Sequence, residues 1–194
     1  MLFFCIGVIL LLAVYALNNL LHRRSNGIHA PDGLIFSQHG EEVSRMRFGF
    51  FPSSFNGCGW IAAHNALCLL GKKPRADRII AEFEWFGAVL GGLFGLSPLC
   101  AACFFRRRGY RTTVTLRRDK MDAAAREGTC CILYYWHGKG AHYIACRWDG
   151  SRFVGYNTGR RSTSPDDLGT SLTAMFCTEK RRARLLITLT EPTQ

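Results

Sequence analysis

Residues 2–21 form an unbroken run without charge, LFFCIGVILLLAVYALNNLL. A helix of about 20 apolar residues is long enough to cross the hydrocarbon core of a bilayer. No Lys or Arg precedes the run and no small-residue cleavage pattern follows it, which favours an uncleaved anchor over a signal peptide. Arg23 and Arg24 flank its C-terminal side and predict a cytoplasmic location for the remaining chain. We therefore expect a single-pass cell-membrane protein with residues 1–22 as its transmembrane anchor.

Three helices are predicted in the segment that follows. Apolar residues recur with helical spacing over 58–70, and Gly71 then stands where a glycine typically ends a helix. Proline and serine at their starts predict two further helices over 74–86 and 97–109. The glycine-rich stretch between these two predicts a loop instead of a second membrane span. Residues 23–52 show little periodicity and are expected to be a linker.

The pattern changes after residue 109 to the alternation that is typical of strands. Asp149-Gly150 separates two of these runs and predicts a two-residue hairpin turn. Short helices are expected over 119–128 and, from a capping pattern at Ser164, through about Phe176. The expected strands are 110–116, 129–136, 141–148, 151–157 and 183–190. Because helices come first and antiparallel strands afterwards, the sequence predicts an α+β fold with the sheet in its C-terminal half.

Length and composition limit the classes of protein to which the chain can belong. The 194 residues allow one domain with a substantial core, which we expect to be residues 53–194. The net charge of +11 indicates an acidic neighbour such as anionic lipid. No nucleic-acid-binding motif accompanies this charge, so no nucleic-acid partner is expected. Nine cysteines, an odd number, agree with a reducing compartment.

Cys58 is the first candidate for chemistry. It lies between Gly57 and Gly59 in the first turn of a predicted helix. Free backbone N–H groups and the positive end of the helix dipole stabilise an anion at this place, which lowers the pKa of a thiol and makes it nucleophilic. The alternative is that Cys58 is a small buried apolar residue, as most free cysteines are.

The predicted hairpin supplies two partners for Cys58. If Asp149 and Gly150 form the whole turn, facing residues have numbers that sum to 299, and His142 faces Asn157. A histidine held by an amide oxygen has a fixed tautomer and orientation, with its other ring nitrogen free to face a thiol. Each residue taken singly fits an ordinary structural position, but together they form a Cys–His–Asn set.

With these residues in view, the chain resembles the papain-like cysteine peptidases, and within them it is most similar to bacterial double-glycine leader peptidases. The resemblance covers roughly residues 53–176. It rests on three stretches, NGCGWIAAHNAL, FGLSPLCAACFFRRRGYRTTVTL and CCILYYWHGKGAHYIACRWDGSRFVGYNTG. It implies a papain-like fold, in which the helix that carries the nucleophile packs on the antiparallel sheet.

The resemblance also implies a role for each residue of the set. Cys58 is then the nucleophile, His142 the general base and acid, and Asn157 the orienting residue, where the leader peptidases more often have aspartate. One position departs from the pattern, because Pro52 stands where the family carries a glutamine that donates to the oxyanion. Among the amides and hydroxyls near Cys58, Asn56 is the expected replacement, and the Cys58 backbone N–H is the expected second donor; Ser53, Ser54 and the more distant Gln38 are the other candidates.

The sequence therefore predicts a membrane-anchored cysteine peptidase. A Cys58 thiolate paired with protonated His142 would attack a peptide carbonyl, and water would then hydrolyse the thioester. The expected partner is a peptide or protein substrate, and no metal or organic cofactor is implied. Two alternatives remain open. The departure at Pro52 fits a weak or inactive peptide-binding scaffold, and the same residues would serve a cysteine acyltransferase or amidase.

Overall fold

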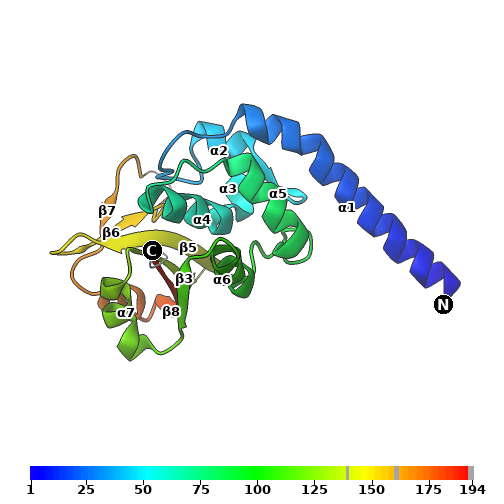
Figure 1. Ribbon diagram of the computed structural model, residues 1–194. Coiled ribbons are helices and arrows are strands. Elements are labelled where there is room, and N and C mark those ends of the chain that lie inside the picture. Colours follow the sequence, from blue (N-terminus) through cyan, green and yellow to red (C-terminus); the bar gives the residue numbers. More distant parts are fainter. Residues whose placement is uncertain (139, 160–161, 192–194) are drawn as a thin grey trace.

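The computed structural model describes residues 1–138, 140–159 and 162–191. A helical N-terminal half is followed by a six-stranded antiparallel sheet, as the α+β prediction requires, and a long helix precedes both (Figure 1). The helices are α1 (Leu2–Ile28), α2 (Glu41–Arg45), α3 (Ser53–Asn56), α4 (Cys58–Leu69), α5 (Ala76–Phe86), α6 (Pro98–Arg107), the 3-10 helix η1 (Arg118–Lys120), α7 (Met121–Glu127) and α8 (Leu172–Phe176). The strands are β1 (Arg47–Phe48), β2 (Phe51–Pro52), β3 (Arg111–Thr115), β4 (Cys130–His137), β5 (Gly140–Trp148), β6 (Phe153–Tyr156), β7 (Asp166–Asp167) and β8 (Arg181–Thr190).

The sheet has the strand order β3-β8-β4-β5-β6-β7 and separates two hydrophobic clusters. Successive side chains of a strand point to opposite faces. On β4, Cys130 and Ile132 accordingly face the cluster that contains α4, α5 and α6, whereas Cys131 and Leu133 face the cluster that contains α7 and α8. Both faces of the central strands are therefore covered by helices.

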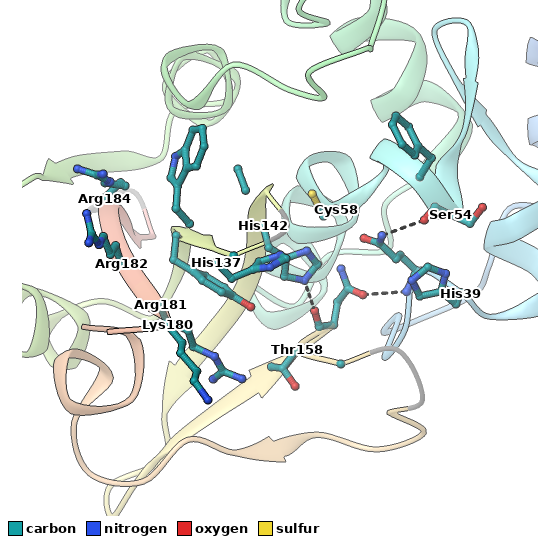
Figure 2. A pocket seen from close by; sticks show the side chains of 18 of the residues that line it. His39, Ser54, Cys58, His137, His142, Thr158, Lys180, Arg181, Arg182 and Arg184 are labelled. Atoms are coloured by element: carbon teal, nitrogen blue, oxygen red, sulfur yellow. Dashed lines mark hydrogen bonds between the residues drawn. The ribbon is translucent and has the colours of Figure 1, made fainter. Parts of the chain in front are cut away.

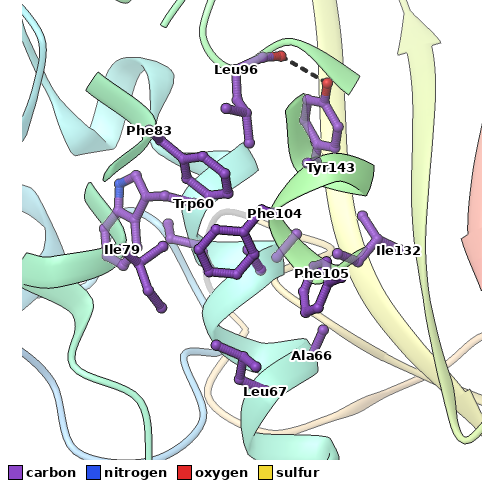
Figure 3. Packing of buried hydrophobic residues seen from close by; sticks show 14 of the residues in the cluster. Trp60, Ala66, Leu67, Ile79, Phe83, Leu96, Phe104, Phe105, Ile132 and Tyr143 are labelled. Carbon is purple, nitrogen blue, oxygen red and sulfur yellow. Dashed lines mark hydrogen bonds between the residues drawn. The ribbon is translucent and has the colours of Figure 1, made fainter. Parts of the chain in front are cut away.

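Helix α4 lies in the middle of the larger cluster and is buried along most of its length. Figure 3 shows aromatic side chains from α4, α5 and α6, namely Trp60, Phe83, Phe104 and Phe105, packed in this cluster. The helix ends as predicted: Gly71 has a φ of +70°, and the N–H groups of Gly71 and Lys72 donate to the carbonyls of Cys68 and Leu67. These two bonds form a Schellman motif, so the C-terminal end of α4 is fixed by local sequence.

The segment expected to be a linker, 23–52, is instead part of the folded domain. Its apolar side chains Ile35, Val43, Met46 and Phe48 are buried in the larger cluster. The Asn65 side chain of α4 pairs with the backbone of Ile35, accepting from its N–H at 2.8 Å and donating to its carbonyl at 2.7 Å. Irregular backbone is held there by a side chain, which leaves no periodic signal in the sequence.

Helix α1 extends six residues beyond the expected anchor boundary at residue 22. Figure 1 shows it projecting from the domain, with its N-terminal half away from all other elements. Within the described ranges it is the single helix with the length and hydropathy needed to cross a membrane, a property that signal sequences share. Its C-terminal half packs on α5 and carries buried polar side chains, including His22 and Asn26.

The helix predicted from Ser164 to Phe176 is wrong over its first half. Asp166 and Asp167 form the short edge strand β7 against β6, and the Asp166 carboxylate accepts hydrogen bonds from Thr158 and Ser162. The helix begins only at Leu172, capped by Ser171, whose Oγ accepts from the Ala174 N–H at 3.0 Å. Pairing with the sheet therefore overrides the local capping pattern. The predicted domain end at residue 194 lies outside the described residues.

Candidate active site

One pocket of about 1150 Å³ contains all three residues of the predicted Cys–His–Asn set. Its walls come from the start of α4, the segment before α2, the β4–β5 turn, the end of β6 and the start of β8. Figure 2 shows the Cys58 sulfur and the His142 ring in the same part of this pocket, on α4 and β5. His142 and Asn157, which are 84 and 99 positions from Cys58 in the sequence, thus line the same pocket as Cys58.

Cys58 is the first residue of α4 and keeps part of its surface open to the pocket. Backbone N–H groups of Tyr143, Gly59 and Cys58 itself stabilise its thiolate, but burial outweighs them and raises the pKa of Cys58 to about 11. The expected lowering of this thiol pKa is therefore wrong. The helix N-terminus is present as predicted, and the surrounding protein removes the water that a thiolate needs.

His142 lies on the part of β5 that has no partner from β6, which pairs with β5 only from Ala145 to Trp148 in the described chain. Its Nε2 is 2.7 Å from the backbone oxygen of Asn157. Burial lowers the pKa of His142, with the hydrogen bond to Asn157 acting in the opposite direction. Because a carbonyl oxygen can only accept, Nε2 carries the proton and Nδ1 is the basic nitrogen of a neutral ring.

Tyr143, the residue that follows His142 on β5, contacts Cys58. The Tyr143 N–H contacts the Cys58 sulfur, and its hydroxyl donates to the Leu96 carbonyl at 2.8 Å, a bond drawn in Figure 3. The free edge of β5 therefore offers a backbone donor to the nucleophile beside the candidate base. Opposite His142 on β4 lies Tyr135, whose ring centroid is 5.7 Å from that of His142.

The register predicted for the hairpin is wrong by two residues. Trp148 pairs with Phe153, so the turn has four residues, because the Asp149 carboxylate accepts from the N–H groups of Ser151 and Arg152. A shift of two preserves the face of every side chain. Asn157 therefore still lies near His142, but its backbone oxygen makes the contact that was predicted for its side chain.

The Asn157 side chain has a different partner. Its Oδ1 accepts from the Gln38 N–H at 2.8 Å, and its Nδ2 is buried with no partner among the described residues. The backbone φ of Asn157 is +62°, a conformation that Asn tolerates better than most residues. This turn of the backbone ends β6 and directs the carbonyl towards His142.

Asn56, the expected oxyanion donor, lies outside the pocket. It is buried, and its Nδ2 donates to the carbonyls of Phe48 at 3.0 Å and Gly92 at 2.7 Å, which occupies both amide hydrogens. Asn56 therefore holds strand β1 to the glycine-rich loop after α5. Sequence distance selected it, since it is the amide nearest to Cys58 along the chain.

Gln38 is the glutamine that lines the pocket. Its Nε2 donates to the Ser54 carbonyl at 3.0 Å and retains a second hydrogen, while its Oε1 is buried with no partner in the described structure. Gln38 precedes Cys58 by 20 residues and lies in the segment expected to be a linker, so distance along the sequence favours Asn56 over it. Its residue type was the available signal, since a glutamine is what the resemblance lacks at Pro52.

The rim of the pocket is strongly basic. Figure 2 shows Lys180, Arg181, Arg182 and Arg184 along its β8 side, and Glu179 is the carboxylate among the residues that line it. In the described chain none of these four cations forms an ion pair with a carboxylate. Their positive charge therefore acts on whatever enters the pocket.

The described residues contain no group of three His, Cys, Asp or Glu side chains arranged to hold a metal ion. Comparison of the chain with models of known protein families gives no match, and comparison with curated proteins gives none either. The residues and geometry of this pocket are therefore the features that indicate a function.

Proposed function

We propose that the chain is a membrane-anchored cysteine peptidase with a papain-like domain, which hydrolyses peptide bonds through Cys58 and His142. The observation that carries the proposal is the junction of α4 with β5, where the Tyr143 N–H contacts the Cys58 sulfur beside His142. A thiol at a helix N-terminus, next to a histidine whose tautomer is fixed, is the arrangement that acyl transfer requires. This arrangement is independent of the resemblance in sequence.

The reaction starts from a neutral thiol and a neutral imidazole, since burial raises the pKa of Cys58 and lowers that of His142. His142 Nδ1 takes the thiol proton as the sulfur bonds to the substrate carbonyl carbon. The same proton then passes to the leaving amine as the C–N bond breaks and a thioester remains. Water attacks the thioester with His142 again as base, which releases the acid product and restores the thiol.

Gln38 supports the oxyanion in this mechanism, in place of Asn56. Its remaining Nε2 hydrogen and the Cys58 N–H at the start of α4 are the donors. The negative charge develops on the substrate oxygen as the C–S bond forms, and the Cys58 N–H then donates to that oxygen. Loss of one such donor costs on the order of 10²–10³ in kcat.

The basic rim favours acidic peptides as substrates. Lys180, Arg181, Arg182 and Arg184 attract carboxylates, and attraction between exposed charges weakens as salt is added. We expect cleavage of an acidic peptide to lose rate between low and physiological ionic strength more steeply than cleavage of its amide (Asn/Gln) counterpart.

A proteome-derived peptide library tests the proposed activity without a known substrate. The full chain in detergent is incubated with the library, and new termini are identified by mass spectrometry for the wild type, Cys58→Ala and His142→Gln. New termini that need both residues support peptide hydrolysis. Peptide hydrolysis by Cys58 is contradicted if the new termini persist in Cys58→Ala. It is also contradicted if folded wild-type protein produces no new termini.

The two alternatives give different results in the same experiment. A binding scaffold retains peptides without cutting them, and Cys58→Ala does not change their retention. A wild-type acyltransferase joins peptides to added amines and a wild-type amidase releases ammonia, and neither produces new peptide termini. Both activities are lost in Cys58→Ala.

The anchor and its orientation are part of the same proposal. Helix α1 has the length and hydropathy of a membrane span, and Arg23 and Arg24 follow its apolar part. Positive charge after the span favours the cytoplasmic side for the domain. A membrane-impermeant reagent directed at a tag after Gln194 should label it only in opened cells, and labelling in intact cells contradicts this orientation.

A further inference from the structure

The part of α1 that is free of the domain is too short to cross a bilayer. Among the described residues its first hydrogen bond to the domain is at Tyr15, whose hydroxyl donates to the Glu84 carbonyl at 2.9 Å. Residues 2–14 span about 20 Å at 1.5 Å per residue, whereas the hydrocarbon core is about 30 Å thick. If α1 crosses the membrane, residues on the domain side of Tyr15 must also lie inside it.

The contacts after Tyr15 fix the domain to the helix. The Asn18 side chain donates to the Gly49 carbonyl at 3.0 Å, and His22 Nε2 lies 2.7 Å from Glu84 Oε1 in a buried pair. Glu84 Oε1 also accepts from the Gly49 N–H at 2.8 Å. Since these bonds connect α1 to helix α5 and to the β1–β2 turn, and the His22–Glu84 pair is buried, the helix cannot be drawn deeper into a bilayer without the domain surface beside it.

That domain surface is apolar. Large hydrophobic side chains are exposed in the β1–β2 turn, at the end of α5 and in the loop that follows α5. These side chains, here called the loop surface, are Phe50, Trp85, Phe86, Val89, Leu90, Leu93 and Phe94. The sequence from Trp85 to Phe105 contains no charged residue. The Phe50 ring lies 5.2 Å from the Tyr15 ring between their centroids, so the loop surface continues the apolar side of α1. Exposed apolar side chains gathered in this way mark an interaction site.

Specific backbone contacts hold the loop surface in a conformation that exposes its apolar side chains. Phe50 N–H donates to the Gly91 carbonyl at 3.0 Å, and a Cβ at Gly91 would meet the Phe50 ring at 2.7 Å. Leu90 has a φ of +48°, which is strained for leucine, and its side chain is 72% exposed. Both the strain and the exposed leucine are unfavourable in water, and an apolar environment removes the second of these costs.

We infer that the loop surface lies in the membrane beside α1, with lipid as its partner. The inference depends on the membrane anchor in the proposed function and not on peptidase activity. It accounts for the shortness of the free helix and for the position of the exposed side chains. The Arg107 guanidinium, 5.1 Å from the Phe86 ring centroid, adds a positive group at the edge of this surface that suits anionic headgroups.

Quenching of tryptophan by brominated lipid acyl chains tests this inference on the full chain. Three variants each add one tryptophan to the four native ones: Phe94→Trp in the loop surface, Leu12→Trp in α1 and Leu116→Trp after β3. All three parent side chains are exposed, and Leu116 leads into η1 and α7, which lie across the sheet from α1. Each variant is reconstituted into vesicles of phosphatidylcholine with and without bromine, and the quenching is compared with that of the wild type.

We expect added emission from Trp at positions 94 and 12 to be quenched, and that from position 116 to remain. Quenching at position 12 with none at 94 overturns the inference while leaving the anchor in place, and the loop surface would then fit a peptide partner. Quenching at neither position overturns the anchor as well. Leu93→Trp repeats the test in case Phe94→Trp does not fold, and circular dichroism of each variant checks folding.

Discussion

Cys58 and His142 occupy the same pocket but depend on different parts of the structure. Cys58 begins a helix that is predicted by the spacing of its own apolar residues and that ends at the Schellman motif of Gly71. His142 lies on the stretch of β5 that pairs with β4 but not with β6, and its ring is oriented by the backbone of Asn157 just after the end of β6. The nucleophile side is therefore local in origin, whereas the base side depends on contacts between distant segments.

This difference changes what substitutions should do. A change of side chain at Cys58 removes the reacting atom, because the atom belongs to the residue itself. A change of side chain at Asn157 leaves the carbonyl that bonds His142 in place. Residues that act through their backbone tolerate substitution as long as the backbone conformation survives.

The largest effect is expected from Cys58→Ala. Removal of a nucleophile from a catalytic set costs on the order of 10⁶ in kcat, so cleavage of a library-derived peptide should fall below detection. Cys68→Ala is the matched control, since Cys68 is also a partly exposed free cysteine of α4 but lies outside the pocket. Equal rates for Cys58→Ala and the wild type would show that Cys58 is not the nucleophile.

The pH dependence of Cys58 alkylation comes next in size. Burial raises the pKa of Cys58 to about 11. At pH values below this pKa, the reactive thiolate becomes tenfold more abundant for each unit by which the pH rises. The rate with iodoacetamide, read at Cys58 by mass spectrometry, should rise about a thousandfold from pH 7 to pH 10. A fast plateau between pH 6 and 8 that disappears in His142→Ala would instead indicate a resting thiolate–imidazolium pair.

Gln38→Ala and Asn56→Ala separate the two candidate oxyanion donors. Gln38→Ala should lower kcat by about 10²–10³ with little change in KM, because the donor acts on the transition state. Asn56→Ala removes the hydrogen bonds to the Phe48 and Gly92 carbonyls, at about 0.5–1.5 kcal/mol each, so Tm should fall while kcat of the folded protein is kept. The reverse pattern in kcat and Tm would restore Asn56 as the donor.

The smallest effect concerns Asn157. Asn157→Gly keeps the carbonyl and permits the φ of +62°, so we expect kcat within about tenfold of the wild type. Asn157→Ala also keeps the carbonyl but adds about 1–2 kcal/mol of backbone strain, which thermal unfolding should detect. If the glycine variant loses as much activity as His142→Ala, the side chain orients His142 after all.

The sequence by itself determined the elements whose causes are local. The apolar run of α1, the helix that begins at Cys58 and ends before Gly71, the period-two strands and the glycine-rich loop after α5 all lie where the pattern predicts them. Each depends on residues within a few positions of one another, through periodicity, capping or glycine conformation. The α+β order of helices and strands follows directly from them.

Only the tertiary structure decided how distant segments meet. The position of Gln38 in the pocket, the role of residues 23–52 as part of the core and the pairing of Asn65 with Ile35 involve irregular backbone, which has no period to read. The pKa of Cys58 also depends on burial by other elements, and this outweighs the local helix N-terminus. Burial and register result from the summed packing of the whole chain, so short-range pattern does not determine them.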